Sequence, residues 1–184
     1  MPKQDYRQRL ESQLGALIPS LPLREEQRAF LQARWLDQIV WMEGRAVFNR
    51  NYYYALRGFT IVGGVTVPAL VRFTASSGAT SGIAITTYIM SFLVALSAAT
   101  EGFFKFGDRW RHYRRTAEAL KSEGWQFIEL SGHYRNFEQH NKAYKAFVQR
   151  TERLLQQDVD SYIAQVASHD QTGAEVDEPK TAVT

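Results

Sequence analysis

Cysteine is absent from this sequence, and its absence excludes several kinds of chemistry. Without a thiol, the 184 residues can form no disulfide, no thiolate metal site and no cysteine nucleophile. Histidine is scarce as well: the four histidines are scattered, and none stands at metal-ligand spacing with a carboxylate. The sequence also has no P-loop, no glycine-rich dinucleotide fingerprint and no nucleophile elbow. We therefore expect neither an enzyme nor a bound cofactor or metal site.

Charged residues are missing from one long central stretch. The mean hydropathy of the chain is slightly negative, as in a soluble protein, yet no charge occurs between Phe73 and Thr100. The first fifty residues, in contrast, carry charges throughout and contain no early apolar run, so we expect no cleavable signal peptide. Entry into a membrane therefore has to use the internal apolar segments.

Two internal segments are apolar enough to predict transmembrane helices. The first covers residues 52–75; its uncharged core is short, but Arg57 and Arg72 can lengthen it by reaching the headgroups at opposite ends. The second covers residues 83–104 and begins with 18 uncharged residues. Residues 76–82 between them are small and polar, which favours a tight loop. The sequence thus predicts a transmembrane helical hairpin.

Basic residues flank this hairpin at one end. They precede the first span and follow the second, whereas only Arg72 lies near the loop. The positive-inside rule then places both termini in the cytoplasm and predicts a multi-pass protein of the plasma (inner) membrane. Tyr53 and Trp110, with Arg57 and Arg72, are expected to anchor the hairpin at the interfaces. The flanking basic residues are Arg45, Arg50, Arg57, Lys105, Arg109, Arg111, Arg114 and Arg115.

Helical spacing of apolar residues continues on both sides of the hairpin, so we expect an all-α protein whose spans continue into a long cytoplasmic helical bundle. A short helix is predicted at 4–17, and a second that starts near Pro22 and runs unbroken into the first span. The second span is expected to continue to about Leu130, before a turn at 131–133 and a last helix at 137–169. The predicted regions are cytoplasmic helices at 1–51, the hairpin at 52–104, cytoplasmic helices at 105–169 and a disordered tail at 170–184.

Several short motifs occur in order around the two spans. They are Leu36-Asp37-Gln38-Ile39-Val40-Trp41, Pro68, Glu101-Gly102, Arg109-Trp110, Tyr113-Arg114 and Thr116-Ala117-Glu118-Ala119-Leu120-Lys121-Ser122-Glu123. Together, over about residues 32–162, they resemble the SLATT family of two-span membrane proteins, in particular its stand-alone branch of unknown function. That family was first grouped by association with bacterial nucleotide-sensing conflict systems, and the resemblance implies a membrane effector that forms pores. This chain departs from the conflict-system members because it has no recognisable sensor domain.

One face of the second span carries a small and mildly polar stripe. Thr87, Ser91, Val94 and Ala98 fall within about 100° of helical arc and lead to Glu101. Such a stripe can line a pore, and Glu101 repeated by symmetry would form an acidic ring that favours cations at the pore mouth. The alternative is helix packing, which small and hydroxylated residues also permit, with Glu101 paired to the lysine one turn later.

A proline interrupts the first span. Pro68 removes a backbone donor and frees the carbonyl of Gly64, and the adjacent Gly63 offers little resistance to bending. A kink at this point could serve as the hinge of a gate. The alternative is static geometry or a close contact between helices.

Two functions of different classes fit these patterns. The first is a homo-oligomeric channel, cation-conducting, in which the second span lines the path and the cytoplasmic helices form a stalk. Its partners are membrane lipids and further copies of itself, and permeant cations are its only ligands. The second is a membrane-anchored scaffold whose cytoplasmic helices bind an unidentified partner. Nucleic acid is not expected as a partner, because the basic residues form no helical stripe with interleaved aromatics.

Overall fold

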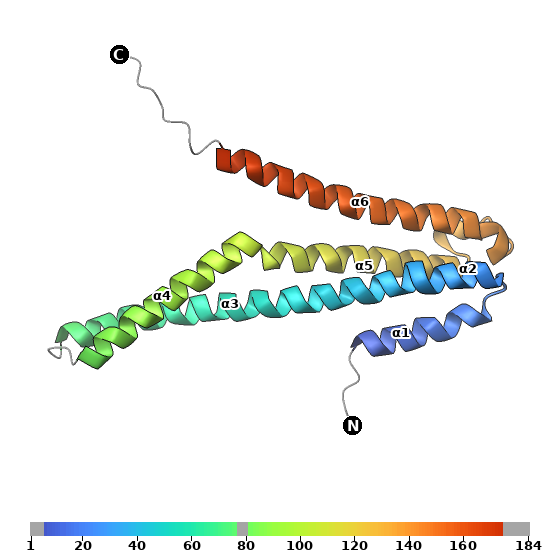
Figure 1. Cartoon of the computed structure of the whole chain (residues 1–184). Coiled ribbons are helices and arrows are strands. Elements are labelled where there is room, and N and C mark those ends of the chain that lie inside the picture. The colour runs from blue at the N-terminus through green and yellow to red at the C-terminus, as the bar shows by residue number, and fades with distance from the viewer. Residues whose placement is uncertain (1–5, 77–80, 175–184) are drawn as a thin grey trace, which may run out of the picture. The chain divides into compact units, whose positions relative to one another are not determined.

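The chain folds into helices throughout the part that the structure describes. The computed structural model describes residues 6–76 and 81–174, with side chains at 6–72 and 82–160. Among these residues there is no strand, which confirms the all-α prediction. The helices labelled in Figure 1 are α1 (Tyr6–Leu17), α2 (Glu25–Phe30), α3 (Asp37–Ser76), α4 (Ser81–Phe104), α5 (Phe106–Ile128) and α6 (His140–Ala174), with the short segments η1 (Ile18–Ser20), η2 (Leu31–Leu36) and η3 (Gly132–Tyr134).

These helices belong to two compact units. The bundle unit comprises residues 1–39 and 116–184, and the hairpin unit comprises residues 40–115. The hairpin unit is longer than the predicted hairpin, because the parts of α3 and α5 that flank the spans also pack on each other. There the ring of Trp41 meets that of Tyr113 edge-on, with 5.7 Å between centroids.

In the bundle unit, local capping sets the start of the long helix. Its first helical residue is Glu25, and the N–H of Arg24 just before it donates to Oε1 of Gln27 at 3.0 Å. From there helical backbone continues through η2 into α3, as the sequence predicts. The segment η2 is π-helical, since the N–H of Asp37 donates to the carbonyl of Gln32 five residues earlier. The sequence gives no signal for this wider turn.

The core of the bundle unit is aromatic. The ring of Phe147 stacks on Phe127 with 4.4 Å between centroids and meets Trp35 edge-on at 6.1 Å. Trp35 also donates its indole N–H to the carbonyl of Leu120 at 2.9 Å. Position 124 has to be glycine here, because a Cβ atom on Gly124 would overlap Cζ2 of Trp35. Other buried residues of the bundle unit are Leu14, Leu31, Leu36, Ala117, Tyr134 and Ala143.

The turn predicted at 131–133 is present as η3. Gly132 has φ +54°, a left-handed conformation that glycine adopts at little cost, and Leu130 shares it at +46°. The last helix begins at His140 and runs to Ala174, past its predicted end at His169. The predicted tail therefore begins within α6, and its remainder at 175–184 lies outside the described residues, as do residues 1–5.

In the hairpin unit, α3 and α4 run side by side (Figure 1) and touch at a glycine. A Cβ atom on Gly63 would overlap Cγ2 of Val94, so the two backbones approach closely at this level. Helix α3 continues through Pro68 as far as Ser76. Residues 77–80 of the predicted loop lie outside the described part of the chain.

The helix of the predicted second span ends at Phe104, contrary to the prediction that it continues to about Leu130. Lys105 has φ +49° and separates α4 from α5. Its N–H closes α4 on the carbonyl of Glu101 at 2.9 Å, and its own carbonyl accepts from Asp108 and Arg109 at 3.1 Å. The new direction packs Gly107 onto the ring of Tyr53, where an added Cβ would lie 2.8 Å from Cε2. We call residues 104–107 the elbow.

Candidate functional site

The outer surface of the hairpin unit is apolar and exposed. Helical stretches at 25–72 and 82–134 each contain a window long and apolar enough to cross a membrane, of which only 6% and 0% of residues are buried. A core helix of a soluble protein would bury such a window. The exposed apolar side chains include Phe59, Ile61, Val62 and Val65 on α3 and Ile85, Tyr88, Phe92 and Leu96 on α4.

The stripe predicted on the second span is partly covered within the hairpin. Thr87 is buried, and Val94 faces Gly63 of α3. Ser91 is half-buried and Ala98 is exposed, so this flank of the stripe stays open. Helix packing therefore accounts for two of these residues, while the open flank can line a shared surface.

Four hydroxyl groups of α4 donate to the backbone of their own helix. Thr87 donates to the carbonyl of Ile83, and Ser91 donates to that of Thr87, each at 2.8 Å. Thr86 and Thr100 donate in the same way at 2.9 and 2.7 Å. These hydroxyl groups can lie in an apolar medium without an unpaired donor, and each oxygen keeps a lone pair for a further contact.

Glu101 lies at the end of α4, one turn before the elbow, and is half-exposed. Beyond the elbow, Arg111 donates to Asp108 at 2.7 Å. This hydrogen bond raises the pKa of the Arg111 guanidinium, and the charges of Asp108 and Glu101 add to the effect. Charges of both signs therefore flank the elbow, at one end of the apolar surface.

The structure separates the predicted hinge residues. Gly63 makes the close contact with α4, whereas a Cβ atom on Gly64 would meet nothing within 4 Å. Pro68 is exposed. Gly63 therefore has a packing role, which was the alternative to a hinge, and the structure assigns no such contact to Gly64.

The predicted interface anchors also differ in placement. Arg57 and Arg72 are exposed at the two ends of the apolar part of α3. Tyr53 is half-buried against Gly107, and Trp110 is half-buried with an indole N–H that has no hydrogen-bond partner among the described residues. The exposed rings at this level are Tyr52, Tyr54, Phe103 and Phe104.

A family comparison covers this region. The model of a family described as "Protein of unknown function (DUF4231)" matches residues 37–142, more than half of the chain. The chain belongs to the DUF4231 family. The DUF4231 match contains the whole hairpin unit. It does not name the SLATT family, so the narrower resemblance stays a prediction. Comparisons with curated proteins and with solved structures gave no match.

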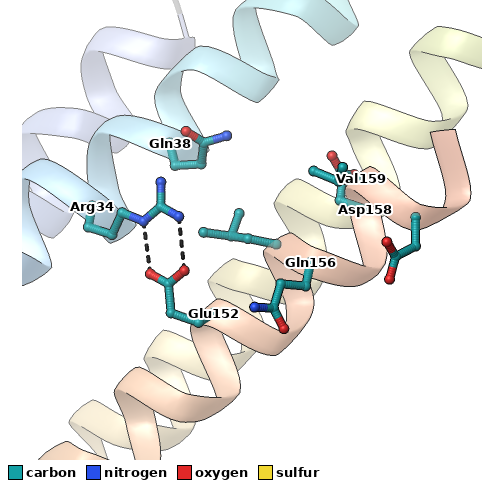
Figure 2. A pocket seen from close by; sticks show the side chains of 8 residues that line it. Arg34, Gln38, Glu152, Gln156, Asp158 and Val159 are labelled. Atoms are coloured by element: carbon teal, nitrogen blue, oxygen red, sulfur yellow. Dashed lines mark hydrogen bonds and ion pairs between the residues drawn. The ribbon is translucent and has the colours of Figure 1, made fainter. Parts of the chain in front are cut away.

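A second candidate site lies in the bundle unit (Figure 2). Arg34 of η2 forms a bidentate ion pair with Glu152 of α6, with N···O distances of 2.8 and 2.9 Å. The pair lowers the pKa of the Glu152 carboxyl. Sequence reasoning missed it, because 118 residues separate the two partners. The open cavity beside the pair has a volume of about 480 Å³ and is lined by Arg34, Gln38, Glu152, Leu155, Gln156, Asp158, Val159 and Asp160.

This cavity is the weaker of the two candidates. It is shallow, and its arginine is already neutralised by Glu152. Among the described residues no group of three or more histidines and carboxylates could hold a metal ion. Most of its lining lies outside the DUF4231 match, which ends at residue 142. The hairpin unit is therefore the region on which a functional proposal is best based.

Proposed function

We propose that this chain is an integral protein of the inner membrane whose copies assemble around a cation-conducting path, with both termini in the cytoplasm. The observation that carries the proposal is the exposed apolar surface of α3 and α4, where membrane-length windows are 6% and 0% buried. Lipid chains or further copies of the hairpin are the surroundings in which such a surface is stable. The resemblance to the SLATT family supports a pore rather than a simple anchor.

The path has to run between copies. Within one hairpin the contact of Gly63 with Val94 brings the helices too close to leave a channel between them. The open flank of α4, with Ser91 and the exposed Ala98, is small enough to line a shared opening. Glu101 at the end of this helix would form an acidic ring in the assembly and attract cations.

The alternative is a membrane-anchored scaffold without conduction. The specific observation in its favour is that Thr87 and Ser91 both donate to carbonyls of their own helix. Hydroxyl groups bonded in this way need no water as an acceptor. The bundle unit would then carry the function by binding a cytoplasmic partner.

Conductance separates these functions. We expect the purified full chain to produce discrete currents in planar lipid bilayers, with cations more permeant than anions. Glu101→Gln should lower the cation-over-anion permeability ratio several-fold, measured as a shift of the reversal potential in a salt gradient, because it removes one charge per copy from the ring. Glu138→Gln makes the same change at an exposed residue of the bundle unit and should leave the ratio unaltered.

An intact oligomer that gives no current above the lipid background at any potential would contradict the channel and favour the scaffold. A current whose selectivity is unaltered by Glu101→Gln would remove Glu101 from the conducting path.

A further inference from the structure

Positive charge is concentrated in the hairpin unit. Residues 40–115 contain nine basic and three acidic residues, whereas the rest of the chain contains thirteen basic and sixteen acidic residues. All of these nine except Arg72 lie at 45–57 or 105–115, beside the apolar surface. The most apolar part of the protein therefore carries a net positive border, although the rest of the chain is net acidic.

Aromatic rings connect the helices at this border. Tyr52 of α3 stacks on Phe106 of α5 with 5.5 Å between centroids, and Phe106 stacks on Phe104 of α4 at 5.4 Å. Phe104 in turn meets Phe103 edge-on at 5.1 Å. Phe103 is 81% exposed, so the row of rings ends at a side chain directed away from the protein. Exposed aromatic rings in such a position are typical of the headgroup region of a membrane.

The ring contact between Tyr52 and Phe106 also determines where two arginines lie along the helix axes. Because α3 and α5 run antiparallel with Tyr52 on Phe106, Arg50 and Arg109 lie at about the same level, just beyond the rings as seen from the apolar surface. Both arginines are exposed. Neither forms an ion pair with any residue among those the structure describes.

Other arginines nearby are already engaged. Arg114 pairs with Glu43 at 2.9 Å, and Arg111 pairs with Asp108 at 2.7 Å. Arg45 lies over the ring of Trp41, with 5.4 Å from its Cζ to the ring centroid. Glu43 and Asp108 therefore pair with arginines other than Arg50 and Arg109.

We infer that Arg50 and Arg109, together with Tyr52, Tyr54 and Phe103, form a collar that binds the headgroups of anionic phospholipids in preference to zwitterionic ones. The phosphate and its net negative charge complement the two guanidinium groups, which can each donate two parallel hydrogen bonds. The exposed rings occupy the depth between the headgroups and the acyl chains. This inference rests on the proposed insertion of the hairpin into a membrane.

Spin-labelled lipids test the collar in the intact protein. The full chain is reconstituted in phosphatidylcholine bilayers that contain a trace of labelled phosphatidylglycerol or labelled phosphatidylcholine, and electron paramagnetic resonance gives the fraction of each label that the protein immobilises. We expect association of phosphatidylglycerol to exceed that of phosphatidylcholine by about twofold or more at low salt, and less at 0.5 M NaCl. R50Q/R109Q should bring the ratio close to one.

The control R135Q/R153Q removes the same charge from two exposed arginines of the bundle unit and should keep the ratio of the unaltered chain. A ratio near one in the unaltered chain, with immobilised lipid present, would overturn the collar while leaving membrane insertion intact. An equal loss of preference in both double variants would also overturn it, since overall charge would then be the cause. Absence of any immobilised lipid would instead contradict the proposed insertion itself.

Discussion

Replacing Trp35 by alanine is expected to lower the free energy of unfolding of the bundle unit by about 3–5 kcal/mol. Trp35 is only 1% exposed, its ring meets Phe147, and its N–H is bonded to the carbonyl of Leu120. Alanine would leave a cavity in the groove that Gly124 keeps open for the indole ring. Hydrogen exchange of the amides at 117–127 and 143–151, measured on the full chain in detergent, reports the free energy of local opening there.

Trp125→Ala provides the matched control for this prediction. Trp125 lies in the same unit, on the same helix as Leu120, but is 46% exposed. Its removal should change the free energy of local opening at the same amides by less than about 1 kcal/mol. Equal effects of the two substitutions would contradict the packing described for Trp35.

Glu123→Ala is expected to destabilise the bundle unit by about 2–3 kcal/mol, because it leaves the buried hydroxyl of Tyr134 and the half-buried guanidinium of Arg150 without their partner. The Glu123 carboxylate accepts from Nε of Arg150 at 2.5 Å and also from the hydroxyl of Tyr134, which is fully buried. Burial of the hydroxyl, with the hydrogen bond to Glu123, raises the pKa of Tyr134. The hydrogen bond to Glu123 likewise raises the pKa of Arg150. Hydrogen exchange of the amides at 134–150, measured on the full chain in detergent, reports this loss of stability.

The exposed ion pair on the same helix supplies the comparison. Glu152→Gln weakens the ion pair with Arg34, in which the Arg34 side chain is 48% exposed and the Glu152 side chain 35%. It should lower the free energy of unfolding by less than about 1 kcal/mol. E123L/Y134F/R150M, which removes the carboxylate, the buried hydroxyl and the guanidinium together, should recover much of the stability lost in Glu123→Ala. An equal loss of unfolding free energy in Glu152→Gln and Glu123→Ala would contradict the larger effect expected for the more buried carboxylate, Glu123.

Much of the fold follows from patterns along the sequence. The uncharged stretch from Phe73 to Thr100 predicts a long apolar helix, and α4 occupies most of it. The regular apolar spacing after Arg24 predicts a helix that continues into the first span, which the structure confirms. Serine and glycine at 131–132 predict the turn that η3 forms. These features depend on local propensity and on periodicity, which a single sequence contains.

Other features depend on contacts between distant residues. The break at Lys105 is invisible in the sequence, because lysine is not a residue that favours positive φ. It follows from the packing of Gly107 on Tyr53, and the same packing turns Tyr53 inward. The pairing of Glu123 with Arg150, 27 residues apart, depends likewise on how α5 and α6 meet.

The stripe on the second span follows from helical spacing, but its surroundings do not. The sequence places Thr87, Val94 and Ala98 on one face of a helix, but only the structure shows that α3 covers the part of this face at Val94 and leaves Ala98 open. Periodicity reports which residues share a face, and it does not report which neighbour occupies that face.

Accessibility of two positions on α4 tests the proposed path most directly. Because the chain has no cysteine, Ala98→Cys and Leu96→Cys each introduce a single thiol, and the two positions lie at nearly the same depth on different sides of the helix. In reconstituted vesicles, a membrane-impermeant thiol reagent should modify the thiol at position 98, which the proposal places on a water-filled path, and spare the thiol at position 96, which the proposal places against lipid. Protection of both thiols would contradict the channel, and modification of both would contradict the membrane-inserted hairpin.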